Sequence, residues 1–279
     1  MKSLDKFLKS FGLAAGIGSA LGAGSLFVVY DIMEKQNEKK SEGLNLVWKG
    51  AHLSKGNHRV VITDQFWKAY IPNIDDPIDK EITINGMKKA YEDLNAACDG
   101  VSFELCTTES EPAKYGVKKI DKLQKDDIAL YVKDIISNSN NVFAQTSFKR
   151  AGMFSSENKD ISITYKTDAL NLVCSKDYLA VPQNAAVYYI TVHESMHAMG
   201  FAHEEKRDSV MYPQASFFKF DYRFLEDPNH TCLTEKDKLA LDKYCVQFYD
   251  VEPKYKENGG KQTVRALQKK VILEEELSF

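Results

Sequence analysis

HESMHAMGFAH, which begins at His193 and ends at His203, is the stretch of this sequence that decides the fold. His193 and His197 are four residues apart, so on an α-helix both imidazoles leave the same face about one turn apart. Glu194 is rotated about 100° from His193 and lies beside the pair. Gly200 has no Cβ, which lets the helix end in a sharp turn that can bring His203 back towards the other two histidines.

Three histidines in this arrangement are typical of a catalytic zinc site. Imidazole nitrogens are common zinc ligands, and three of them leave the fourth tetrahedral position open for water. We therefore predict that His193, His197 and His203 bind one zinc ion and that Glu194 acts as the base for the attacking water. The chain has six histidines, and three of them fall at these positions. A chance set of core or surface histidines accounts poorly for that pattern.

A methionine in a predicted tight turn follows the histidines. The sequence SVMYP places Met211 two residues before Pro213. None of the seven methionines lies after Met211, so it is the only candidate for a turn beneath the metal. We expect its thioether to fill space in the packing there and not to bind the metal.

Together these motifs resemble the metzincin clan of zinc peptidases. The likeness is specific over residues 184–213 and looser, in the order of elements, from about 45 to 248. The short spacing between third histidine and methionine, the sequence MYP and the late segment LTEKDKLALDKYC resemble the matrixins, whereas MHAMGFAHE resembles the astacins. Tyr212 directly follows Met211, so the additional tyrosine ligand of astacins is not expected.

The resemblance implies an α/β (α+β) zincin domain that hydrolyses peptide bonds as an endopeptidase. Its parts are a twisted mixed sheet, a backing helix, the zinc-binding helix and a C-terminal helix. It also implies that a protein or peptide substrate lies extended beside an edge strand at 141–148, where Val142 and Ala144 are candidate docking residues. Pro213, after the methionine, is a candidate wall of the side-chain pocket.

One catalytic zinc ion is the only metal expected. Matrixins commonly hold a structural zinc through further histidines, but no histidine lies between His58 and His193, and Gln145 stands where one would be expected. The sequence contains no evident acidic, glycine-rich calcium loop either. Neither structural zinc nor calcium is therefore expected.

Two other functional classes fit parts of this pattern. One is a non-catalytic, membrane-tethered interaction module that retains a zinc site. The intact Glu194 argues against it, because holding a metal needs no such carboxylate. The other is a zinc hydrolase of a non-peptide amide or ester. A small substrate would not need the edge strand, so a test of docking at that strand separates this class from a peptidase.

Hydrophobic periodicity predicts the helices and strands around the motif. Apolar residues at helical spacing predict helices at 82–97 and 184–199. Thr234 is the expected N-cap of a last helix that ends near residue 247, with Asp237 in the capping-box position. An early strand pair is predicted at 46–48 and 59–62, and further strands at 101–107, 127–135, 141–148 and 160–165.

The N-terminal segment has the character of an export signal. Residues 11–30 carry no charge, follow several lysines, and as a helix would span the roughly 30 Å core of a bilayer. We expect a signal anchor or cleaved signal peptide at 1–30, a polar linker at 31–44, the catalytic domain at 45–250 and a charged tail at 251–279. The domain would then lie outside the cytoplasm, either membrane-anchored or secreted after cleavage.

Net charge and cysteine content limit the choices further. The formal net charge of −3 offers no basic excess to neutralise phosphates, so nucleic acid is not an expected partner. Cys98 with Cys106 and Cys232 with Cys245 could form two disulfides and leave Cys174 alone. The alternative is five unpaired thiols, because pairing does not follow from sequence.

Overall fold

A computed structural model describes residues 22–70, 77–133, 143–152, 155–166, 183–205, 209–213 and 233–255 of the chain. The architecture is mixed α/β, with one six-stranded, mostly parallel sheet. The helices are α2 (Gly22–Ser41), α3 (Asp64–Tyr70), α4 (Pro77–Ala97), α5 (Ser110–Ala113), α7 (Gln183–Met199) and α8 (Glu235–Tyr249). The strands are β1 (Gly56–Ile62), β2 (Val101–Thr107), β3 (Lys118–Lys119), β4 (Ile128–Lys133), β5 (Ala144–Arg150) and β6 (Asn158–Lys166).

The sheet has the strand order β3-β2-β1-β4-β6-β5. Only β5 runs antiparallel to its neighbour among the described strands. It forms one edge of the described sheet, the position that the resemblance implies for this segment. Beyond Ser147 the register with β6 shifts, so Asp160 and Ile161 lie opposite Phe148. Asp160 has a φ of +50°, which marks it as the extra residue of a β-bulge in β6.

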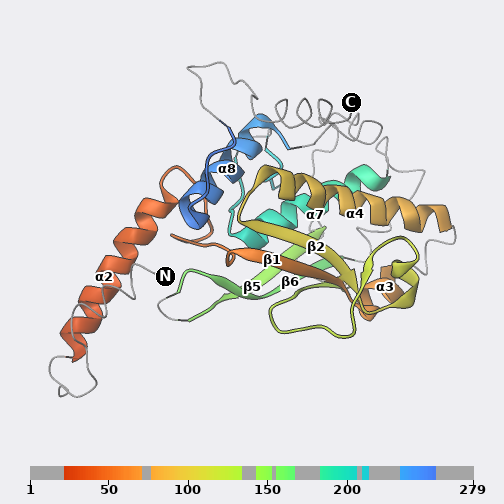
Figure 1. Cartoon of the computed structure of the whole chain (residues 1–279), viewed down its shortest axis with the longest axis horizontal. Helices are drawn as coiled ribbons and strands as arrows, with labels where there is room; N and C mark the ends of the chain where they lie inside the picture. Colours follow the sequence, from red (N-terminus) through yellow and green to blue (C-terminus); the bar gives the residue numbers. More distant parts are fainter. Residues whose placement is uncertain are drawn as a thin grey trace, which may run out of the picture.

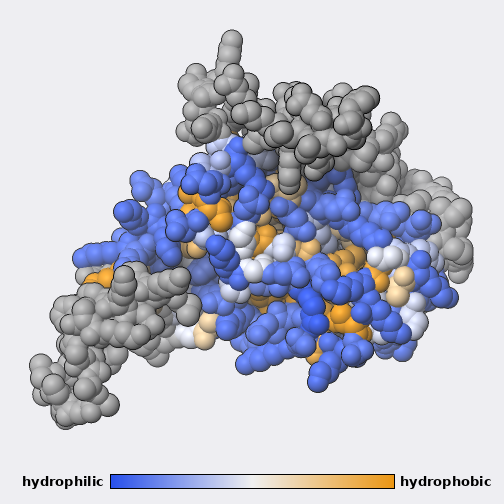
Figure 2. All heavy atoms as spheres, in the orientation of Figure 1, coloured by the Kyte–Doolittle hydropathy of each residue, from blue (hydrophilic) through white to orange (hydrophobic). Residues whose placement is uncertain are grey.

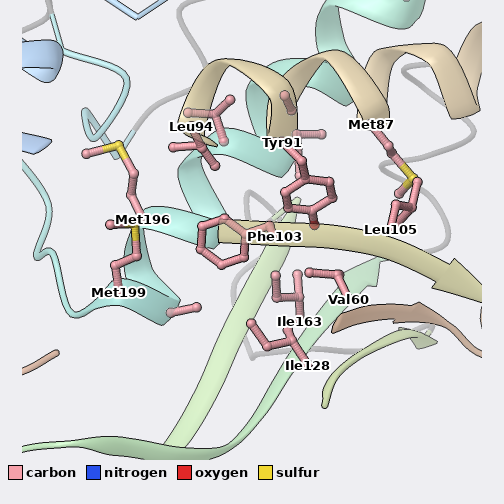
Figure 3. Packing of buried hydrophobic residues seen from close by; sticks show 14 of the residues in the cluster. Val60, Met87, Tyr91, Leu94, Phe103, Leu105, Ile128, Ile163, Met196 and Met199 are labelled. Atoms are coloured by element: carbon pink, nitrogen blue, oxygen red, sulfur yellow. The ribbon is translucent and has the colours of Figure 1, made fainter. Parts of the chain in front are cut away.

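The core lies between the sheet and the paired helices α4 and α7, which pack side by side on one face of it (Figure 1). Tyr91 and Leu94 of α4 point towards Phe103 of β2, and Met196 of α7 lies beside them (Figure 3). The Tyr91 and Phe103 rings have their centroids 5.6 Å apart. Burial of each such side chain contributes about 1.5–3 kcal/mol. The face of the domain seen in Figure 2 is mostly hydrophilic, with hydrophobic residues scattered over it.

The structure confirms most predicted elements and corrects the first strand pair. The predicted helix at 82–97 begins earlier, at Pro77, and the later strands and helices fall close to their predicted positions. The segment 59–62, however, lies in a central strand that pairs in parallel with β2 and β4. Leu46 makes only an isolated bridge, with Phe201. The run Val60-Val61-Ile62 is buried on both faces, which suits a central parallel strand and not a two-stranded hairpin.

The segment expected to be a polar linker is largely helical. Residues 31–41 complete α2, which packs against α8 and reaches out from the sheet domain (Figure 1). The Asn37 amide Nδ2 donates to Ser156 Oγ at 2.7 Å, so this part of the chain is attached to the domain. Among the helices of the described ranges, none has the length and apolar character needed to cross a membrane. Residues 11–21 and 256–279 lie outside those ranges.

One disulfide joins the end of α4 to α8 through Cys98 and Cys245. The sequence-based pairing of Cys98 with Cys106 is therefore wrong, and so is that of Cys232 with Cys245. Cys106 is a buried free thiol near the far end of β2. The strand carries it away from Cys98, while α8 crosses the end of α4. Cys174 and Cys232 fall outside the described residues.

Candidate metal centre

Helix α7 is held by the face that it buries. Tyr188, Val192 and Met196, spaced four residues apart, are all at most 1% exposed. The Tyr188 hydroxyl also donates to Asp93 Oδ2 of α4 at 2.6 Å. With the helix fixed in this way, His193 and His197 project from it one turn apart, as the four-residue spacing predicts.

The helix ends in a Schellman turn that redirects the chain. The Gly200 amide donates to the His197 carbonyl at 2.9 Å, and the Phe201 amide donates to the Met196 carbonyl at 3.0 Å. Gly200 has a φ of +110°, and a Cβ there would lie 2.6 Å from the Ala51 carbonyl oxygen. Both conditions require glycine, and the resulting turn brings the following residues back beside the helix.

The three predicted histidines converge on one point. The Nε2 atom of His197 lies 3.1 Å from Nε2 of His193 and 3.1 Å from Nε2 of His203. One ligand atom from each residue lies within 4.8 Å of the others, so the three can together hold a metal ion. Two nitrogens bound at the usual zinc distance in a tetrahedron are about 3.3 Å apart, close to the observed separations.

Hydrogen bonds on the other ring nitrogens orient two of these histidines. His193 Nδ1 lies 2.7 Å from the Val210 carbonyl, and His197 Nδ1 lies 2.8 Å from the Phe201 carbonyl. Because a carbonyl only accepts, each Nδ1 carries the proton and each Nε2 presents a lone pair. Burial lowers the pKa of both imidazoles to about 4, so they are neutral near pH 7. Converging lone pairs repel one another unless a cation lies between them, and this donor set therefore fits a metal ion.

The third histidine is held through its main chain by the N-terminal segment. Asn45 Nδ2 donates to the His203 carbonyl at 2.7 Å, and the Asn45 carbonyl accepts from the Ala202 amide at 2.9 Å. The Val47 amide adds a bond to the Gly200 carbonyl at 2.9 Å. The sequence contains no signal that would have identified Asn45, which lies 158 residues before His203.

Glu194 is a buried carboxylate beside the three histidines. Glu194 is only 4% exposed, and Thr146 Oγ1 of β5 lies 2.7 Å from the Glu194 Oε2 atom. Burial raises the pKa of Glu194, while His197 and the hydrogen bonds from Thr146 lower it. A carboxylate in such surroundings can accept and release a proton near the metal position.

The predicted methionine turn is present. The Tyr212 amide donates to the Ser209 carbonyl at 3.1 Å and closes the turn. Met211 is 1% exposed and packs in the core cluster, in keeping with a packing role. Val210, within the turn, supplies the carbonyl that accepts from His193. The turn thus supports one of the candidate ligands directly.

Sequence reasoning assigned Asp237 to a helix cap and missed its contact with this turn. The capping box with Thr234 is formed as predicted. In addition, Asp237 Oδ1 accepts from Ser209 Oγ at 2.7 Å, and its Oδ2 accepts from the Val210 amide at 3.1 Å. One buried carboxylate therefore joins α8 to the turn that orients His193.

The candidate substrate-binding residues remain predictions. Ala144 is the first residue of β5 and is 9% exposed, while Pro213 is exposed just after the methionine turn. Val142 lies outside the described residues.

Comparisons with known proteins do not place this chain in a family. No protein-family model matches it, and no curated protein matches its sequence significantly. The metzincin resemblance therefore remains an expectation from the sequence motif.

Proposed function

We propose that this protein is a zinc-dependent endopeptidase of the metzincin type, matrixin-like in the spacing around its methionine turn. One observation carries the proposal. Three imidazole Nε2 atoms converge on one point beside the buried carboxylate of Glu194. A closed structural zinc site would use a fourth protein ligand, and the metal-ligand cluster found in the described residues contains only these three histidines.

Zinc is the metal that suits this donor set best. Three neutral imidazoles favour zinc, copper, iron or nickel over magnesium or calcium, which prefer oxygen ligands. Within that group, three protein ligands with an open fourth position are characteristic of hydrolytic zinc enzymes. A zinc ion bound here would polarise the scissile carbonyl and lower the pKa of a bound water.

Glu194 is assigned the proton transfer. Its carboxylate accepts a proton from the attacking water and delivers it to the amine that leaves when the peptide bond breaks. The side chain is buried at a fixed position against β5, so little reorganisation is needed when the water reacts. A merely metal-binding module would have no use for a buried carboxylate at this position.

An edge strand next to this carboxylate favours a polypeptide substrate. The outer side of β5 has no partner strand within the described sheet, and its residues are mostly exposed. An extended peptide can add there through main-chain hydrogen bonds. Ala144 would lie at one end of the docked segment, and Pro213 would border the pocket beside the scissile bond.

We also propose that the catalytic domain lies outside the cytoplasm. The Cys98–Cys245 disulfide suits an oxidising compartment. The uncharged residues 11–30 would provide the anchor or export signal for such a location.

The decisive experiment measures zinc content and cleavage of quenched fluorescent peptides by the full-length chain. It compares the wild type with Glu194→Gln, which keeps the shape of the side chain and removes its basicity. We expect one zinc per chain in both proteins and chelator-sensitive cleavage only in the wild type, with a loss of at least about 1,000-fold in the variant. Cleavage retained by Glu194→Gln would remove Glu194 from its role. Folded protein without zinc would overturn the proposal.

A further inference from the structure

We propose that Thr146 on β5 is a positioning residue that fixes the carboxylate of Glu194, an inference that rests on the proposed function. Nothing in the zinc motif points to this residue, because Thr146 lies 48 positions before Glu194. The contact arises only because the edge strand passes α7 at the position of the motif glutamate.

The hydroxyl of Thr146 contacts Glu194 twice. Its Oγ1 atom lies 2.7 Å from the carboxylate Oε2 and 2.8 Å from the main-chain carbonyl oxygen of the same residue. A threonine hydroxyl has one proton to donate, and both acceptors belong to Glu194. Whichever acceptor it serves, the hydroxyl therefore ties this residue to β5.

Burial makes this contact matter for the geometry. Glu194 is only 4% exposed, so bulk water cannot easily replace a lost partner. Within the described ranges, the hydrogen bonds to its carboxylate come from the hydroxyl and the main-chain amide of Thr146. A glutamate side chain has three rotatable bonds, and with the main-chain amide as its remaining partner it would sample more rotamers than with both bonds in place. The proton acceptor would then spend less time at the reacting water.

The strand holds Thr146 itself in a defined place. Thr146 pairs with Ile163 of β6 in the regular part of the ladder, before the bulge opposite Phe148. Its β-branched side chain has few χ1 rotamers, which further fixes the hydroxyl. Because β5 is also the proposed docking strand, one element would set both the path of the substrate and the position of Glu194.

The test uses three substitutions on β5 in the full-length chain, zinc-loaded for the kinetics and metal-free for crystallography. Thr146→Val keeps the shape and removes the hydroxyl, Thr146→Ser keeps the hydroxyl, and Ser147→Ala removes a hydroxyl from the opposite face of the same strand. Two readouts are taken: kcat and KM for peptide cleavage, and the position of the Glu194 carboxylate in crystal structures of the metal-free proteins. Zinc content and thermal unfolding verify that each variant folds.

We expect Thr146→Val to lower kcat by about 10- to 100-fold with KM changed less than about threefold, and to displace the carboxylate. Thr146→Ser and Ser147→Ala should stay within about threefold of the wild type in kcat and keep the carboxylate in place. A wild-type kcat in Thr146→Val together with an unmoved carboxylate would overturn the positioning role. Should the wild type cleave no peptide, the proposed function fails. The crystal structures would still decide whether Thr146 positions Glu194. A displaced carboxylate in Thr146→Val would support the positioning role and an unmoved one would overturn it.

Discussion

Gly200 shows how one residue without a side chain makes the metal centre possible. At this position α7 ends and the chain turns towards His203. With a φ of +110° and the Ala51 carbonyl 2.6 Å from any added Cβ, the backbone here excludes every other residue type. Gly200→Ala must therefore either strain the turn or push the segment around Ala51 away. We expect it to lower the free energy of unfolding by about 2–4 kcal/mol and to weaken zinc binding at least about tenfold.

Urea unfolding of the metal-free protein and a competitive zinc titration measure these two effects. Gly152→Ala is the matched control, because a Cβ at Gly152 meets nothing within 4 Å. That variant should unfold within about 0.5 kcal/mol of the wild type. Equal stability and zinc affinity in the two variants would show that the turn at Gly200 tolerates a side chain.

Individual residues were predictable here where their role depends on local spacing. His193, His197 and Glu194 lie on one helix, so helical geometry alone places them. Thr146 and Asn45 reach the centre from distant parts of the chain and are ordinary polar residues in sequence. Nothing in a single sequence distinguishes such residues from surface threonines and asparagines, because their role comes from tertiary packing.

At the scale of elements, α8 supports the centre through Asp237 at its first turn. This carboxylate accepts from Ser209 Oγ and the Val210 amide, as well as from Thr234 within the capping box. Asp237→Asn places an amide NH2 where a carboxylate oxygen now meets donors. We expect the free energy of unfolding to fall by about 1–3 kcal/mol. We also expect zinc affinity to fall about 3- to 10-fold, because Val210 would hold His193 less firmly.

Glu235→Gln provides the control for that substitution. It neutralises an acidic residue in the same first turn, where Glu235 is exposed and forms an ion pair with Lys238. A loss of at most about 0.5 kcal/mol with unchanged zinc affinity is expected. If Asp237→Asn behaves in the same way, the bond to the turn contributes little to the metal centre.

Helices and strands were predicted well where hydrophobic periodicity is strong. Which distant segments pair with one another was not predicted. The helix at 82–97 and the strand at 101–107 are found as expected, with small differences in length. The bridge between Leu46 and Phe201 and the disulfide between Cys98 and Cys245 join segments far apart in the chain. Such pairings follow from how the layers stack, which the periodicity of a single segment does not contain.

Considered as a whole, the molecule attaches its N-terminal segment to both the domain and the metal centre. Helix α2 contacts the domain through Asn37, whose amide donates to Ser156, and through packing on α8. The Ser41 hydroxyl accepts from the Gly50 amide at 2.6 Å and directs the chain after the helix. Asn45 then donates to the His203 carbonyl. We therefore expect stability and metal binding to depend on different parts of one continuous segment.

Two variants separate these roles. A chain lacking residues 1–43 loses α2 and its contacts but keeps Asn45, so we expect its free energy of unfolding to fall by about 1–3 kcal/mol while zinc affinity stays within about threefold. Asn45→Ala in the full-length chain should do the reverse, with a stability loss of about 1 kcal/mol or less and zinc affinity reduced about 3- to 10-fold. Urea unfolding and competitive zinc titration distinguish the two patterns. If the truncated chain loses zinc while Asn45→Ala retains it, the role assigned to Asn45 is wrong. The packing of α2 on the domain would then be the contact that holds the His203 segment in place.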